Sequence, residues 1–234
     1  SSAASDVYKR QDYLTVHQYD GILLLSQTNL RYFAGFTGTT AVGFVTPYTA
    51  FILTDSRYTE QAQNQCEGYE VIQYKGSTWE TIAEIVKTRN ITLSVCAFEG
   101  NYVPVDTYQT FSDILVGSRF ASVNLTSLRA VKRPDELTLM REAARIGDEA
   151  FAALLPQLKT GMTERDARVI LEIEMLKRGS EEPSFDTIVA SGHRSSMPHG
   201  VASDKVIEDG DFVTFDFGAV YQGYHSDTVS YTHL

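Results

Sequence analysis

The sequence predicts a layered α/β domain followed by a helical region that ends in a β-hairpin. Short apolar runs alternate with segments of helical periodicity over residues 12–128. Two long amphipathic helices are expected between residues 134 and 179. Aromatic and β-branched residues then dominate residues 212–221, which is typical of a strand.

The first domain is expected to contain five strands and four helices. Buried apolar runs predict the strands, and Pro47-Tyr48 provides a turn between two of them. Thr28 is a candidate N-cap for the first helix, Trp79 and Ile82 share one face of the third, and Pro104 begins the fourth. The predicted strands cover residues 21–26, 41–46, 50–54, 69–74 and 93–98, and the helices cover residues 28–33, 56–65, 78–87 and 104–116.

A second domain is expected from residue 129, which places the boundaries at 12–128 and 129–228. Pro134 followed by two acidic residues begins a long helix, because negative charge suits its N-terminal dipole. Thr163 and Asp166 form a capping-box pattern for the next helix, and Gly179 ends it. A short strand over residues 187–190 then leads into a loop over residues 191–200.

The hairpin at residues 212–227 brings two aspartates together. With Gln222-Gly223 as a two-residue turn, Tyr221 pairs with Tyr224, and counting outward sets Gly218 opposite Asp227. Asp216 then lies on the same face as Asp227, as a diagonal neighbour about 7–8 Å away. Two carboxylates on one face of an apolar hairpin require a compensating partner, and a cation is the favoured one.

Composition narrows the class of protein. The chain has 234 residues, is 43% hydrophobic and 21% charged, and has a formal net charge of -10. Without a basic patch, this acidic balance argues against nucleic-acid or anionic-membrane partners. The apolar runs are too short to span a bilayer. Cys66 and Cys96 are isolated, which favours a reducing, cytoplasmic location.

Both ends resemble a translated sequencing adapter. Asp6 to Gln11 can be encoded by GATGTGTATAAGAGACAG, and the reverse complement, read in a shifted frame, encodes Val229 to Leu234. We therefore expect residues 1–11 and 229–234 to be artefactual, and Thr228 to straddle the junction. On this hypothesis the chain is a fragment, truncated at its C-terminal end.

Several motifs resemble those of the Xaa-Pro peptidases, aminopeptidase P and prolidase, in the pita-bread M24 metallopeptidase family. They are Phe185-Asp-Thr-Ile-Val-Ala-Ser-Gly192, Pro198-His-Gly200, Gly210-Asp-Phe212 and Asp216-Phe-Gly-Ala-Val-Tyr-Gln-Gly-Tyr-His-Ser-Asp227. Upstream, Asn29-Leu-Arg-Tyr-Phe-Ala-Gly-Phe-Thr-Gly38 and Leu53-Thr-Asp-Ser-Arg-Tyr58 resemble the creatinase-type N-terminal domain. The implied fold is an α/β creatinase-type domain followed by the first half of an α+β pita-bread domain.

The resemblance implies metal-dependent hydrolysis of the bond between an N-terminal residue and proline. It assigns Asp216 and Asp227 to a site for two divalent ions, with Mn²⁺ favoured over Co²⁺ or Zn²⁺, and His199 to substrate contact and catalysis. The expected substrate is a proline-containing peptide, and a homodimer is the expected assembly. A creatinase-like amidinohydrolase and a non-catalytic pita-bread binding module remain alternatives. The family's other metal ligands lie downstream of the hairpin, so the chain alone is expected to be inactive.

Overall fold

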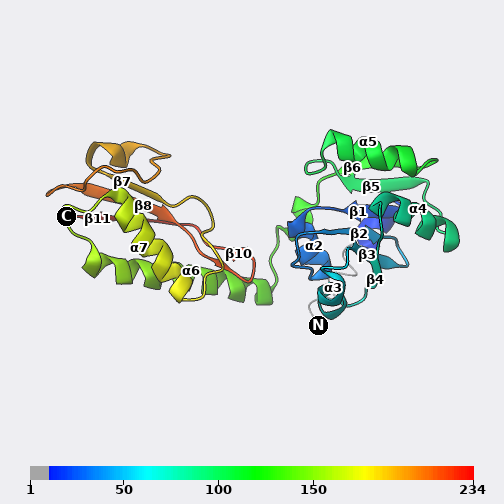
Figure 1. The fold of residues 1–234 in the computed structure, drawn as a ribbon, viewed down its shortest axis with the longest axis horizontal. Coiled ribbons are helices and arrows are strands. Elements are labelled where there is room, and N and C mark those ends of the chain that lie inside the picture. Colours follow the sequence, from blue (N-terminus) through cyan, green and yellow to red (C-terminus); the bar gives the residue numbers. More distant parts are fainter. Residues whose placement is uncertain (1–10) are drawn as a thin grey trace. The chain divides into compact units, whose positions relative to one another are not determined.

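The computed structural model describes residues 11–234, and the chain divides into two compact units between Val131 and Lys132 (Figure 1). The predicted domain boundary follows residue 128 and stays a prediction. Of the predicted adapter segment at residues 1–11, all but Gln11 lies outside the described residues. In the described part of the chain, no helix has the length and apolar character needed to cross a membrane.

The first unit is built on a six-stranded mixed sheet with the order β4-β3-β2-β1-β5-β6. The β1–β2 and β2–β3 pairs are antiparallel, whereas β3–β4, β1–β5 and β5–β6 are parallel. Residues 46–49 join β2 to β3 by a tight turn, whereas a helix lies in each connection from β3 to β4 and from β5 to β6, as parallel pairing requires. The strands are β1 (Gly21–Leu24), β2 (Ala41–Val45), β3 (Ala50–Thr54), β4 (Glu70–Gln73), β5 (Val95–Glu99) and β6 (Arg119–Val123).

Helices cover both faces of this sheet, so its central strands are apolar on both sides (Figure 1). Leu24 belongs to a core with Phe33, whereas Leu23 belongs to a core with Ile82 and Phe111. The helical elements are α2 (Gln27–Ala34), α3 (Thr59–Gln65), α4 (Thr78–Thr88), α5 (Val105–Ile114) and the 3₁₀ helix η1 (Thr126–Arg129).

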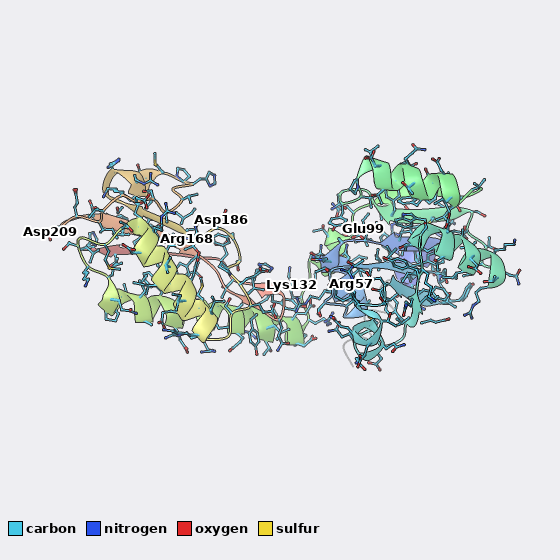
Figure 2. The ribbon with its side chains drawn as sticks, in the orientation of Figure 1. Arg57, Glu99, Lys132, Arg168, Asp186 and Asp209 are labelled. Carbon is cyan, nitrogen blue, oxygen red and sulfur yellow. The ribbon has the colours of Figure 1, made fainter. Side chains whose placement is uncertain are left out.

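Two details of this unit differ from the sequence-based expectation. Ser26, not Thr28, caps α2, and its hydroxyl accepts from the backbone N–H of Asn29. Buried Glu99 at the end of β5 accepts from Ser26 and Asn29, which favours this earlier start of the helix (Figure 2). Strand β6 was not predicted, because it is an edge strand whose residues are mostly exposed or half-buried.

The second unit packs two helices against one face of a small antiparallel sheet. Its core joins Ile146 of one helix and Leu171 of the other to Phe215 and Phe217 of the central strand. Figure 2 labels Arg168 on α7 and Asp209 in the turn before β8. The elements are α6 (Pro134–Leu154), η2 (Leu155–Gln157), α7 (Glu164–Lys177), β7 (Ile188–Ser191), η3 (Gly192–Ser196), β8 (Phe212–Phe217), β9 (Val220–Tyr221), β10 (Tyr224–His225) and β11 (Thr228–His233).

The predicted hairpin register is confirmed. Tyr221 pairs with Tyr224, and Gln222 and Gly223 both adopt positive φ, at 45° and 72°, which defines a type I′ turn. The strand pairing is interrupted over a few residues and resumes where Phe217 pairs with Thr228. In this part of the sheet, β8 lies between β7 and β11. Residues 229–233 therefore pair with β8 in the structure, and their adapter origin stays a prediction.

Candidate metal centre

Strand alternation sets the direction of the Asp216 side chain. Val213, Phe215 and Phe217 are fully buried against the helices, so Asp216 must emerge on the other face of β8. Ile188 of β7 and Val229 of β11 lie directly opposite Asp216 on its two sides. The carboxylate thus projects from the central strand of this three-stranded sheet.

Asp227 joins the same face from the two-residue segment between β10 and β11. Gly218 falls opposite Asp227 in a register that holds on both sides of it, so Asp216 and Asp227 are diagonal neighbours. The chains approach closely here, because a Cβ on Gly218 would lie 2.0 Å from the Ser226 carbonyl oxygen. Glycine is therefore needed at position 218, because any side chain there would overlap the Ser226 carbonyl oxygen.

The electrostatics of Asp216 reflect this arrangement. Burial raises the pKa of Asp216, the charge of Asp227 raises it further, and His199 opposes both effects. The Oδ1 atom of Asp216 is buried and has no hydrogen-bond partner among residues 11–234. A buried carboxylate oxygen without a donor beside a second carboxylate is an environment that a cation would stabilise.

His199 reaches this face through the loop between β7 and β8. Val201, two residues further on, forms an antiparallel bridge with Ile188, the residue directly opposite Asp216. The hydroxyl of Thr214, on the same face of β8 as Asp216, lies 3.4 Å from the carbonyl oxygen of Ser195. The loop is thus held on the sheet face that carries Asp216, and His199 itself is exposed.

The two aspartates fit a divalent metal ion as part of its ligand shell. Carboxylate oxygens suit hard ions such as Mn²⁺, and the unpartnered Oδ1 of Asp216 is available as a metal-ligand atom. Over the described residues, however, no group of three or more histidine, cysteine, aspartate or glutamate side chains is placed to hold a metal. Asp216 and Asp227 can therefore supply only some of the ligands.

A polar network at the base of the loop was not predicted from the sequence. Its centre is Glu164, which has no exposed surface and accepts from the backbone N–H and the hydroxyl of both Ser191 and Ser203. Burial alone would raise the pKa of Glu164, but these hydrogen bonds outweigh it and lower the pKa. The sequence signal is ambiguous, because a glutamate in the first turn of a helix is usually explained by the dipole.

Comparison with known proteins defines the class. Residues 138–233 match the metallopeptidase family M24, and residues 7–131 match the creatinase/prolidase N-terminal domain. The chain is similar to an Xaa-Pro dipeptidase structure from Bacillus anthracis, with a TM-score of 0.94 and 38% identity, covering 99% of this chain and 65% of that one. Similarity to prolidase from Pyrococcus furiosus gives a TM-score of 0.87 at 29% identity, covering 97% and 70% of the two chains.

The chain therefore belongs to the creatinase/prolidase family and joins its N-terminal domain to part of an M24 metallopeptidase domain. Among curated relatives, peptidase YqhT of Bacillus subtilis is 43% identical over 210 residues, covering 89% of this chain and 59% of that protein. An Xaa-Pro dipeptidase of Pyrococcus furiosus is 33% identical over 220 residues, covering 92% and 60%. The chain thus spans about 60% of the length of these relatives.

Proposed function

We propose that the whole protein is an Xaa-Pro peptidase that hydrolyses the bond between an N-terminal residue and proline. The observation that carries the proposal is the buried, unpartnered oxygen of Asp216, next to Asp227 and on the face reached by the His199 loop. The similarity to Xaa-Pro dipeptidases supports the substrate class. Dipeptidase and aminopeptidase activity are both compatible with these residues.

Asp216 and Asp227 are proposed as ligands of two divalent ions, with Mn²⁺ favoured. When bound, such ions supply a hydroxide nucleophile and polarise the scissile carbonyl. Asp216 contributes a carboxylate from the central strand, and Asp227 contributes a second from the short segment between β10 and β11. His199 is proposed to donate a hydrogen bond to the substrate carbonyl oxygen as negative charge develops on it.

The 234-residue chain by itself is proposed to lack peptidase activity. Two carboxylates hold a pair of divalent ions weakly, and the described residues provide no third ligand at the site. The chain should therefore show no hydrolysis of an Xaa-Pro dipeptide in the presence of Mn²⁺. Manganese-dependent cleavage by the chain alone would contradict this proposal.

The metal-ligand assignment is tested in a form that spans the full length of the relatives. Asp216→Asn and Asp227→Asn should each lower kcat/KM for an Xaa-Pro dipeptide by about a hundredfold or more, since even partners outside the ligand shell reach that range. Asp209→Asn is the matched control, because this exposed residue lies in the turn before β8 (Figure 2). Full activity of Asp216→Asn with Mn²⁺ would overturn the assignment. The same full-length form is also assayed with creatine. Hydrolysis of creatine would indicate a creatinase-like amidinohydrolase, and no activity on either substrate would favour a non-catalytic binding module.

Two further properties are proposed for the whole protein. A cytoplasmic location is supported by Cys66 and Cys96, which are both buried and free in the structure. A homodimer is proposed from the resemblance to the peptidase family. Light scattering coupled to size-exclusion chromatography tests the assembly, and a monomeric mass across the micromolar range would contradict it.

A further inference from the structure

A single buried carboxylate, that of Glu164, holds together the two ends of the loop that carries His199. Ser191 marks its beginning and Ser203 its end, and both donate backbone and side-chain hydrogen bonds to Glu164 at 2.6–3.0 Å. The two ends bind different oxygens, Oε1 for Ser191 and Oε2 for Ser203. Glu164 therefore fixes the distance between the ends of the loop.

Arg194 extends this closure toward His199. Its Nε lies 3.2 Å from Oε2 of Glu164, and its Nη2 donates to the carbonyl oxygen of Val201 at 2.8 Å. Glu164 has no exposed side-chain surface, so this ion pair is shielded from solvent on one side. The guanidinium thus joins the first turn of the loop to Val201. Val201 forms the β-bridge with Ile188 and lies two residues after His199.

A second set of contacts holds the base of the loop. Lys205 Nζ donates to the hydroxyl of Ser191 at 3.0 Å and to Oδ2 of Asp211 at 2.7 Å. Gly192 has φ of 56°, and a Cβ there would lie 2.5 Å from Oδ1 of Asp211, so glycine is required on both counts.

We propose that Glu164 and Arg194 are positioning residues, which hold the loop of residues 192–203 so that His199 stays over the sheet face of Asp216. The inference rests on the proposed function, because it assigns His199 a role in the reaction. Neither Glu164 nor Arg194 needs to contact the substrate. Burying a carboxylate carries a large desolvation penalty, which here is offset by four hydrogen bonds and an ion pair. Ordering of the loop that carries His199 explains why Glu164 is buried at this position.

The closure of the loop is tested first by hydrogen exchange on the 234-residue chain. Arg194→Gln should speed exchange of amides in residues 192–203 by about tenfold, because it removes the ion pair and the bond to Val201. Arg194→Lys should restore part of the protection. Arg165→Gln is the matched control, because Arg165 also joins α7 to the loop region, through an exposed pair with Asp204 at 2.8 Å. Unchanged exchange in Arg194→Gln would overturn the inference.

The link to His199 is tested with kinetics in the full-length form. Arg194→Gln should lower kcat about tenfold with little change in KM, and should have little further effect in the His199→Ala background. An equal loss in both backgrounds would overturn the positioning role. An unchanged kcat in His199→Ala would instead overturn the proposed role of His199, while faster loop exchange in Arg194→Gln would still support the closure. Glu164→Gln repeats the test, but Arg194→Gln is the main variant because it leaves the four hydrogen bonds of Glu164 in place.

Discussion

Substitution of Gly218 by alanine tests the strand geometry that brings the two aspartates together. The added Cβ would lie 2.0 Å from the backbone oxygen of Ser226 and 2.8 Å from Oγ of Ser184, whereas ordinary contacts begin at 3.4 Å. The strands must therefore move apart by about 1 Å or more to accept a methyl group. Gly218 lies between the two proposed ligands in the register, so this movement also changes their separation.

The energetic cost can be estimated from the contacts at risk. Ser226 donates from its backbone N–H to the carbonyl oxygen of Ala219 at 2.9 Å, and Ala219 N–H donates to the Ser226 hydroxyl at 2.9 Å. Weakening two buried hydrogen bonds costs about 1 kcal/mol each, and overpacking costs about 1–3 kcal/mol. The expected loss of stability for Gly218→Ala is therefore at least about 3 kcal/mol, which lowers the Tm of a unit of this size by about 12–24 °C.

Thermal unfolding followed by far-UV circular dichroism measures this loss on the 234-residue chain. Trp79 is the only tryptophan and lies in the first unit, so its fluorescence provides an internal reference. Gly147→Ala is the matched control, because its Cβ would lie 3.5 Å from Phe217 and 3.8 Å from the Ser226 hydroxyl, within ordinary contact distance. That helical substitution should be neutral or stabilise by up to about 1 kcal/mol. A Tm for Gly218→Ala within about 3 °C of the wild type would refute the close approach.

Three other predictions concern the same unit. Tyr224→Phe removes a hydrogen bond of 3.0 Å to buried Glu136 and should lower the free energy of unfolding by about 1–2 kcal/mol in urea titrations; no loss would contradict a formed bond. Thr163→Ala removes the α7 N-cap and should cost about 1 kcal/mol by the same assay, whereas a neutral result would show that the cap is replaced. Hydrogen bonding from the backbone of Glu208 and from Lys205 lowers the pKa of Asp211, so its stabilisation is present above the unfolded pKa and is lost as the pH falls through the folded one. Asp211→Asn should therefore destabilise at pH 7, and the loss should shrink as the pH is lowered below the ordinary aspartate pKa of about 3.9; a loss that stays constant over that range would contradict the linkage.

Local sequence patterns were sufficient for most of the secondary structure. The Gln222-Gly223 turn and the alternation of side chains along a strand predicted the register that makes Asp216 and Asp227 diagonal neighbours, and the structure confirms that register. These signals are local, because a turn type and a two-residue period each depend on adjacent residues. Edge strand β6 was missed for the opposite reason, since only its pairing with β5 identifies it.

The amino-acid sequence by itself determined which carboxylates share a strand face and which family motifs the chain carries. Only the tertiary structure decided that Glu164, at the start of α7, is buried beneath the loop between β7 and β8 and bonded to Ser191 and Ser203. Those contacts join residues 27 and 39 positions apart, and no local periodicity encodes them. A buried charge is stabilised by partners that folding brings to it, so its role becomes visible only when the partners are in place.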